Sequence, residues 1–378
     1  MSRLDELIQE LCPAGVELRK IKEVYTRLKG TPITAGKMKE IDNPNGDIKV
    51  FAGGKTVIKA FEEDIPRANI IRVPAVLVQS RGVIDAVYYE EPFTFKNEMW
   101  AYTADEKTSV KYLYYVLKNN IQQFRVAASG MGSMPQISLK VTEEFIIPVP
   151  PLPVQSEIVR ILDNFTELTA ELTAELTARK QQYEYYRKQA LCFDGNTPME
   201  RLGDTCLMKS GKAIKATFIS ETQSKTNQYK CYGGNGVRGF VSELSHQGEY
   251  PIIGRQGALC GNINYAVGDF YATEHAVVVK SLGKYIPRFL FYLLTAMNLN
   301  QYKSQGAQPG LAVGNIENLL APVPSIKKQE YIVNLLDRFD TLCNDISKGL
   351  PAEIEARQKQ YEYYRDKLLT FKESSDEN

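Results

Sequence analysis

The chain has 378 residues, 43% of them hydrophobic, and a formal net charge of +1. This length exceeds one typical core and predicts two domains with connecting segments, while the balanced charge does not by itself indicate a nucleic-acid binder. Six cysteines without a C-x-x-C pair and only two histidines argue against a zinc site or a disulfide framework, and favour a reducing compartment.

Residues 1–16 begin with MSRLDELIQELCP, which is charged and amphipathic. A secretory signal would instead show a basic segment followed by an apolar run. No stretch of eighteen apolar residues, the length needed to span a bilayer, occurs anywhere in the chain. We therefore expect a short N-terminal helical segment on a cytoplasmic protein.

Residues 17–147 combine short apolar runs with turn clusters rich in Gly, Asn and Pro. The run from Ala75 to Gln79 predicts a strand and the stretch from Val110 to Phe124 a helix, so the block is interpreted as an α+β domain. Gly54-Lys55-Thr56 imitates the end of a P-loop, but Lys49 stands where the motif requires another glycine. No ATP site is expected.

Residues 148–196 change character, because glycine and proline disappear after PVPPLP and apolar residues follow at helical spacing. The stretch TELTAELTAELTA repeats a TAEL tetrad, which places Leu168, Leu172 and Leu176 on one stripe of a long helix. Four residues advance a helix by ~6 Å, which lies between one and two base-pair steps of ~3.4 Å. The tract is therefore predicted to act as a ruler.

Residues 197–321 repeat the pattern of strands and turns, with a strand at Pro251 to Gly254 and a helix at Ile286 to Met297. The string Gly234, Gly236, Gly239 imitates a dinucleotide-binding motif, but FVSELSHQGEY follows it where that motif needs a helix. We interpret it as a turn. The block carries 12 Lys+Arg against 8 Asp+Glu, and residues 17–147 carry 19 against 16.

Residues 322–378 duplicate the first helical block. PVPPLPVQSEIVRILDNF at Pro148 returns as PVPSIKKQEYIVNLLDRF at Pro322, and both copies lead into QYEYYR. The second copy has four additional residues, with Gly349, Leu350 and Pro351 interrupting the helical pattern, which predicts a bent or broken helix. Two apolar stripes favour antiparallel helices that separate two domains, and the alternative is one globular core.

The two preceding blocks share landmarks. Gly53-Gly54 matches Gly233-Gly234, Ser80-Arg81-Gly82 matches Arg255-Gln256-Gly257, and LCPAG near the N-terminus matches LCFDG at Leu191. The last match predicts a pseudo-twofold ring with neighbouring termini.

The chain resembles the specificity subunit of type I restriction–modification systems, with the TAEL tract typical of one subgroup. The resemblance rests on the PVPPLxxQ motif, the TAEL tract and the repeated QYEYYR, and it implies that residues 17–147 and 197–321 are target recognition domains. Each would read one half of an interrupted site in double-stranded DNA, while the helices set the gap. Two modification subunits would bring S-adenosylmethionine and methylate adenine, and restriction subunits would use ATP and magnesium. This chain would bind no cofactor and catalyse no reaction.

Base edges in the major groove are read by polar side chains, with arginine suited to guanine and glutamine to adenine. The matching loops make Arg81, Arg255 and Gln256 the first candidates for DNA contact. The further candidates, chosen by loop position and polarity, are Lys55, Arg125, Ser129, Arg238, Lys303, Gln305 and Gln308.

The tyrosines of the two QYEYYR copies cover more than one helical face, so they suit either helix core or a partner surface. The candidates for partner binding are Tyr183, Tyr186, Tyr361 and Tyr364. At an equivalent position of the two helical blocks, Glu157 in the first copy stands where the second has Tyr331. The two docking faces are therefore not expected to be equal.

Two further functions remain open on these residues. One is a helical scaffold whose variable domains bind something other than DNA. The other is a methyltransferase, but no N-P-P-Y-type string for adenine methylation occurs, and Asn43-Pro44-Asn45 is interpreted as a turn. The two histidines and the cysteines are expected to be structural.

Overall fold

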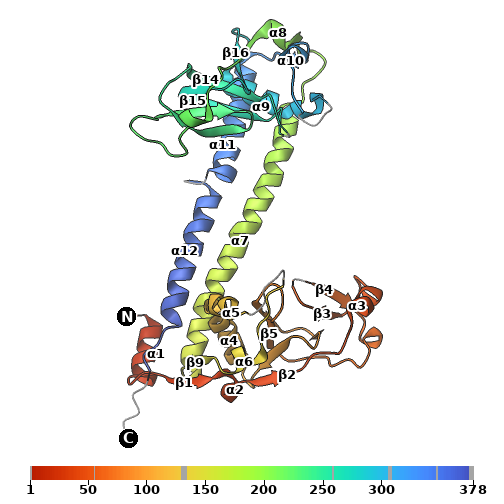
Figure 1. The fold of residues 1–378 in the computed structure, drawn as a ribbon, viewed down its shortest axis with the longest axis vertical. Helices are drawn as coiled ribbons and strands as arrows, with labels where there is room; N and C mark the ends of the chain where they lie inside the picture. The colour runs from red at the N-terminus through yellow and green to blue at the C-terminus, as the bar shows by residue number, and fades with distance from the viewer. Residues whose placement is uncertain are drawn as a thin grey trace. The chain divides into compact units, whose positions relative to one another are not determined.

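The computed structural model describes residues 2–54, 56–128, 134–257, 259–304, 309–345 and 348–373. The chain divides into two compact units, Met1–Leu172 with Ile354–Asn378 and Thr173–Glu353. Each unit holds strands and helices in one mixed domain (Figure 1). The predicted class, two α+β domains with long helices, is confirmed, and the alternative of one globular core is wrong.

Within the described residues, the strands of the first unit form sheets ordered β2-β8-β5-β6, β4-β3-β7 and β1-β9. The strands are β1 (Glu17–Lys20), β2 (Thr26–Leu28), β3 (Ile48–Phe51), β4 (Val57–Ala60), β5 (Ala75–Gln79), β6 (Asp85–Tyr89), β7 (Phe93–Phe95), β8 (Trp100–Thr103) and β9 (Ile146–Val149). The helices are α1 (Arg3–Leu11), α2 (Ile21–Val24), α3 (Ala35–Ile41), the 3-10 turn η1 (Glu62–Asp64), α4 (Lys107–Asn119), α5 (Ile121–Val126) and α6 (Leu139–Glu143).

The strand β5 is buried on both faces, which explains its uninterrupted apolar sequence. Alternate residues of a strand point to opposite faces, so Val76 and Val78 join the core that contains α4. Ala75 and Leu77 join a second core with residues of the three-stranded sheet. The predicted strand at Ala75 to Gln79 is confirmed. The predicted continuous helix from Val110 to Phe124 is wrong in one respect, because Asn120 leaves helical geometry and separates α4 from α5.

In the described part of the second unit, one sheet has the order β11-β16-β14-β15-β12-β13 and a second pairs β10 with β17. The strands are β10 (Met199–Arg201), β11 (Cys206–Ser210), β12 (Tyr229–Gly233), β13 (Gly236–Val241), β14 (His246–Gly254), β15 (Ile263–Ala272), β16 (Ala276–Ser281) and β17 (Leu320–Pro322). The helices are α8 (Leu202–Thr205), the 3-10 turns η2 (Ala216–Phe218) and η3 (Leu299–Tyr302), α9 (Pro287–Ala296) and α10 (Val313–Glu317).

The six-stranded sheet of the second unit carries α9 on one face. Ile253 and Val277 join the core with α9, and Ile252 and Val278 join the core on the opposite face. The strand predicted at Pro251 to Gly254 is the last part of β14, and the helix predicted at Ile286 to Met297 is α9 with its two capping residues. Proline at the first helical turn suits this start, since the missing N–H would have no helical partner.

The two domains differ where the second has one long strand. β15 pairs with β14 on one side and, in parallel, with β12 on the other. In the first unit the corresponding stretch of chain forms two strands, β6 and β7, and Pro92 lies between them. Proline supplies no N–H to a ladder, so the equivalent strands belong to separate sheets of four and three strands.

Helix α7 (Leu152–Ala190) follows the first domain, and α11 (Ile326–Asn344) follows the second. The hydroxyl of Tyr115 donates to Asp163 of α7 at 2.5 Å, and the hydroxyl of Tyr292 donates to Asp337 of α11 at 2.5 Å. Burial, followed by the bond to the aspartate, raises the pKa of both tyrosines, which therefore remain donors. This equivalent pair of contacts supports the predicted duplication.

The glutamine of the repeated PVPPLxxQ motif closes the start of each helix. The side-chain amide of Gln155 donates to the carbonyl of Pro150 at 2.8 Å, and that of Gln329 donates to Pro324 at 2.9 Å. Both glutamines are buried. The motif therefore has a structural role, which is to join the strand β9 or β17 to the helix that follows.

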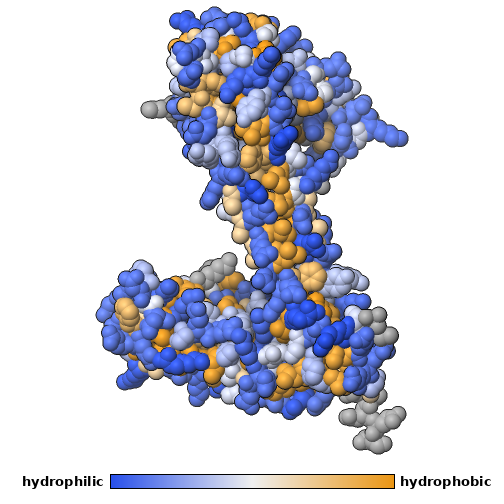
Figure 2. Space-filling model, turned by 180° about the vertical axis from the view of Figure 1, so that it is seen from behind, coloured by the Kyte–Doolittle hydropathy of each residue, from blue (hydrophilic) through white to orange (hydrophobic). Residues whose placement is uncertain are grey.

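The TAEL tract is helical throughout, because α7 runs without interruption over 39 residues. Its three leucines, Leu168, Leu172 and Leu176, are half-buried while most of their neighbours are exposed. Figure 2 shows apolar residues gathered along the long helices. The second copy is broken as predicted, since α11 ends at Asn344 and α12 (Leu350–Leu368) begins six residues later.

Helices pair inside each unit. In the first unit, α12 runs antiparallel to the first half of α7 (Figure 1), and the rings of Phe165 and Tyr364 stack with centroids 5.6 Å apart. Segments near the two ends of the chain also pair in this unit, where the N–H of Val16 donates to the carbonyl of Lys372 at 2.9 Å. The predicted proximity of the termini is confirmed.

Candidate nucleic-acid interface

Both domains hold one loop by the same backbone hydrogen bonds. In the first unit residues 80–82 pair with residues 135–137, and in the second residues 255–257 pair with residues 309–311; we call these two segments the clamp loops. The bonds are Ile137 N to Ser80 O at 2.9 Å and Gly82 N to Pro135 O at 2.8 Å, matched by Leu311 N to Arg255 O at 2.8 Å and Gly257 N to Pro309 O at 3.0 Å. The landmark match made from sequence is confirmed.

A glycine-rich hairpin lies beside each clamp loop. In the first unit the N–H of Gly54 donates to the carbonyl of Arg81 at 2.9 Å. In the second, a Cβ on Gly254 would lie 1.8 Å from the carbonyl oxygen of Gly234, so only glycine permits this approach. Gly234, Gly236 and Gly239 lie in the β12–β13 hairpin, which confirms their interpretation as a turn.

The middle residue of each clamp loop, Arg81 or Gln256, is exposed, whereas the residue before it is turned toward the domain. Ser80 is fully buried and donates to the carbonyl of Glu98 at 2.6 Å. Arg255 is half-buried, with a guanidinium nitrogen 3.4 Å from the Ser210 hydroxyl. Arg255 and Gln256 were both predicted to contact DNA. The side chain of Arg255 is turned toward its own domain, whereas that of Gln256 is exposed.

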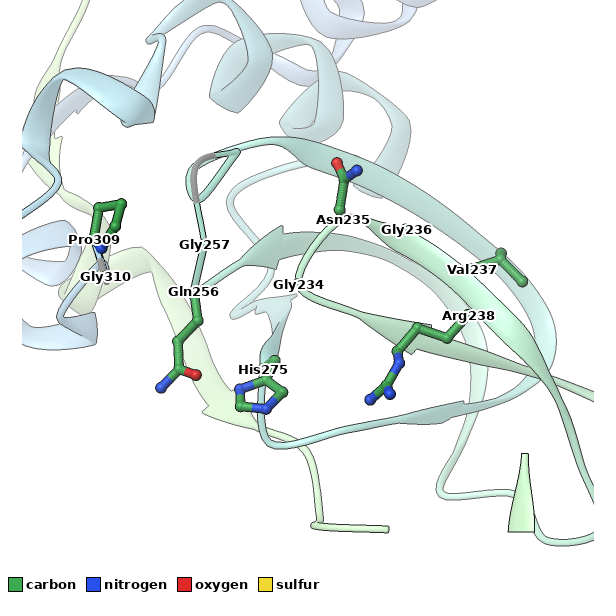
Figure 3. Close-up of a pocket in the computed structure, with 10 residues that line it drawn as sticks. All are labelled: Gly234, Asn235, Gly236, Val237, Arg238, Gln256, Gly257, His275, Pro309 and Gly310. Carbon is green, nitrogen blue, oxygen red and sulfur yellow. The ribbon is translucent and has the colours of Figure 1, made fainter. Parts of the chain in front are cut away.

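Gln256 lines an open pocket of about 710 Å³ in the second unit. Figure 3 shows the polar ends of Gln256, His275 and Arg238 gathered in the lower part of the view. They come from three different segments of the domain. The lining residues are Gly234, Asn235, Gly236, Val237, Arg238, Gln256, Gly257, His275, Pro309 and Gly310.

His275 belongs to this pocket, although the sequence left it as a structural residue. Its Nε2 lies 3.2 Å from Oε1 of Glu274. The other polar atoms of the pair, His275 Nδ1 and Glu274 Oε2, are buried and have no hydrogen-bond partner in the described part of the chain. The signal available in the sequence was its position directly after Glu274.

The remaining candidates are spread more widely. Arg238 is exposed, and its side-chain stem covers Gly233. Arg125 donates from Nε to the carbonyl of Ile84 at 3.1 Å, and Lys303 donates to the side chain of Asn300 at 3.1 Å. Lys55, Ser129, Gln305 and Gln308 lie outside the described residues.

Several exposed lysines lie on the second domain. Lys212 and Lys215 occupy the segment between β11 and β12, and Lys209 and Lys230 lie on those strands. Among the described residues, none of these four ammonium groups has a carboxylate within 4.0 Å. Unpaired cations favour contact with phosphate groups.

The tyrosine clusters mainly serve packing within the chain. Tyr183 packs against the core of the second unit and Tyr361 against that of the first, and burial raises the pKa of both. Tyr186 stacks on Phe339, as Tyr364 does on Phe165, and the two are 38% and 39% exposed. The partner surface stays a prediction for these residues.

The middle tyrosine of each cluster is its most exposed member. Tyr185 is 60% exposed and Tyr363 is 63% exposed, so these two offer more free surface than the four chosen from sequence. The three tyrosines of each hexapeptide thus divide between packing within the chain and exposure to solvent. The helical period explains the division, because neighbouring residues cannot share one face.

The two helical blocks differ at the position noted from sequence. Glu157 is buried and pairs with Arg160 at 2.6 Å, and the hydrogen bond from Arg160 lowers its pKa. Tyr331 is 62% exposed, with Lys328 Nζ 5.5 Å from its ring centroid. The two surfaces are therefore chemically unequal.

The described residues contain neither a metal-ligand cluster nor a membrane-spanning helix. Within the described ranges, no group of three or more His, Cys, Asp or Glu side chains is placed to hold a metal ion. In the same part of the chain, no helix has the length and apolar character of a membrane span.

Comparison with known proteins agrees with this architecture. The description "Type I restriction modification DNA specificity domain" matches residues 13–179 and again residues 196–356. The crystal structure of a type I restriction-modification system S subunit from M. genitalium matches with a TM-score of 0.65 at 17% identity, covering 93% of this chain and 96% of that one. At this identity the likeness concerns the fold.

Two curated relatives come from Escherichia coli. The type I restriction enzyme EcoprrI specificity subunit is 47% identical over 253 residues, which span 63% of this chain and 63% of the relative. The EcoR124I/EcoR124II specificity subunit is 34% identical over 319 residues, which span 71% of this chain and 72% of the relative. The chain thus matches less than two thirds of the first relative's length. With both of its halves matched by the same domain, the chain belongs to the family of type I restriction–modification DNA specificity proteins.

Proposed function

We propose that this chain recognises a two-part sequence in double-stranded DNA as the specificity subunit of a type I restriction–modification complex. Residues 17–147 and 197–321 are the two recognition domains, and each reads one half-site. The observation that carries the proposal is the repeated clamp loop, which presents an exposed polar side chain at the same point of both domains. Base edges are recognised by such side chains.

Electrostatics supports DNA as the ligand. The excess of basic over acidic residues is 19 against 16 in residues 17–147 and 12 against 8 in residues 197–321. The exposed lysines of the second domain, which have no carboxylate within 4.0 Å among the described residues, can contact phosphates, and phosphate contacts supply most of the affinity for DNA. Arg81, Gln256, Arg238 and the other candidate loop residues would supply the sequence preference.

Catalysis is assigned to other subunits. Two modification subunits carry S-adenosylmethionine and methylate adenine, and restriction subunits use ATP and magnesium. The helical blocks are the proposed docking surfaces, and the difference between Glu157 and Tyr331 makes the two docking events unequal. Tyr185 and Tyr363 join the four predicted tyrosines as candidates for this contact. The cytoplasmic location stays a prediction.

Exchange of one domain tests the proposal. Residues 197–321 are replaced by the equivalent block of another family member, and the chain is co-expressed with its modification subunits. Sequencing of methylated bases should then show one half-site replaced, with the other half-site and the gap unchanged. A change in both half-sites, or a wild-type chain that directs no methylation and binds no duplex in the presence of those subunits, would refute the proposal.

A further inference from the structure

The two clamp loops place one residue of each domain in the same backbone environment. Arg81 forms a β-bridge with Gln136, and Gln256 forms one with Gly310. The carbonyl of the residue before and the N–H of the glycine after are bonded to the facing segment in both domains. Position 81 and position 256 are therefore equivalent, although the residues that fill them differ.

The clamp consists of backbone hydrogen bonds, so it does not depend on the side chain at its centre. Gly82 and Gly257 have φ values of 79° and 95°, a conformation that glycine adopts readily and other residues rarely do. The backbone on both sides of the central residue is thus held in place. A side chain on such a fixed base loses little freedom when it binds, which favours specific recognition.

The side chains at these positions keep their hydrogen-bonding groups available. In the described part of the chain, the contact of Arg81 is from Nε to the sulfur of Met134 at 3.2 Å, and thioether sulfur is a weak acceptor. Gln256 is exposed and reaches into the pocket beside His275 and Arg238 (Figure 3). Arg81 forms no ion pair with a described carboxylate.

Arginine and glutamine recognise different bases. The guanidinium offers two parallel donors, which match O6 and N7 of guanine, whereas the amide offers one donor and one acceptor, which match N7 and N6 of adenine. We propose that residues 81 and 256 are equivalent specificity-determining positions, with Arg81 reading a guanine in one half-site and Gln256 an adenine in the other. This inference rests on the proposed function.

The neighbouring polar residues do not share this equivalence. Ser80 and Arg255 also occupy matching positions, but both side chains are turned toward their own domain. In each of the matched triplets, residues 80–82 and 255–257, only the central side chain is thus exposed and polar. Each domain should change its preference at one base pair when that single residue is replaced.

Reciprocal substitutions test the inference. Arg81→Gln and Gln256→Arg are made in the full chain, which is co-expressed with its modification subunits, and the methylated sequences are determined. Arg81→Gln should convert one G·C pair of the first half-site to A·T, and Gln256→Arg should make the opposite change in the second. Binding to the original site should fall roughly 10- to 100-fold in each variant.

The untouched half-site serves as an internal control for folding. Arg72→Gln and Gln247→Arg make the same side-chain changes elsewhere in the two domains and should leave both half-sites as in the wild type. If the wild type recognises a two-part site but both reciprocal variants keep every base of it, the inference is wrong while the proposed function stands. If the wild-type chain recognises no two-part site, both the inference and the proposed function are wrong.

A second pair of variants covers the case in which methylation is lost. Arg81→Ala and Gln256→Ala are assayed for binding to a library of duplexes in which one base pair at a time is varied. Relaxed preference at one pair of the corresponding half-site supports the inference. A uniform loss across all duplexes identifies a phosphate contact and overturns it.

Discussion

Removal of one TAEL tetrad, Thr173–Leu176, should shorten the gap between the two recognised half-sites without altering either of them. Helix α7 has 39 residues and, at 1.5 Å per residue, a length of ~58 Å. The deletion removes ~6 Å, which corresponds to between one and two base-pair steps of ~3.4 Å. We expect the gap to decrease by one or two base pairs.

The tetrad also preserves the face of the helix. Four residues turn an α-helix by about 400°, so residues beyond the deletion are displaced by only about 40°. Leu168 and Leu172 precede the deletion and stay on the half-buried stripe, while the tyrosines that follow it keep their approximate direction. Deletion of two residues would turn them by about 200°, to the opposite face, and should destabilise the chain instead.

The chain returns between the units through α12, so this connection must adapt to a shorter α7. Its start is held by Gly349, whose N–H donates to the carbonyl of Asp345 at 2.9 Å, and by the buried side chain of Leu350. We expect the single deletion to lower the melting temperature. A matched second deletion, Ala352–Glu355, should restore part of that loss.

The recognised sequence of each variant is read by sequencing methylated bases in cells that also express the modification subunits. Glu171→Gln, an exposed change within the same tract that keeps its length, is the control and should leave the gap as it was. Altered half-sites with an unchanged gap would refute the idea that the helix measures the spacer.

Two further predictions concern stability. Tyr115→Phe and Tyr292→Phe each remove a 2.5 Å hydrogen bond to a helix aspartate and should lower the free energy of unfolding, measured in urea, by about 1–2 kcal/mol. Tyr185→Phe, at a 60% exposed side chain, should leave this free energy unchanged. Equal effects at all three positions would contradict a stabilising role for the two tyrosine–aspartate bonds. Burial, and then the charge of a nearby lysine, lower the pKa of His246, so the neutral ring stabilises the fold above its ordinary pKa of about 6.5 and this contribution is lost as the pH falls below that value. His246→Phe should reduce the fall in the free energy of unfolding between pH 7 and 5.5, measured in urea at both pH values; a fall equal to that of the wild type would contradict this role for His246.

Long repeated segments were the part of the fold that sequence predicted well. The TAEL tract specifies a helix through many consecutive good helix formers, and glycine followed by proline near position 350 indicates the break between α11 and α12. The strand β5 was visible as a short apolar run bounded by turns. In each case the information lies within a few neighbouring residues, which is why the prediction succeeded.

Contacts between segments that are distant in the chain were harder to predict from the sequence. The inward direction of Arg255 depends on a residue far away in the chain, because its guanidinium lies 3.4 Å from the Ser210 hydroxyl. Tyr183 and Tyr361 lie at equal positions of the repeated hexapeptide, and their packing against a core follows only from the way each helix meets its domain. His275 was missed because the partners that define its pocket come from other segments.

The duplication separates what holds the domains from what they are proposed to read. The anchoring contacts recur with nearly the same chemistry, such as the tyrosine–aspartate pair at 2.5 Å in both units. The clamp loops recur through backbone hydrogen bonds alone, so their central side chain can change at little cost to stability, because the bonds around it do not involve that side chain. If residues 81 and 256 read bases as proposed, new sequence preferences can arise there while the helices and their spacing stay as they are.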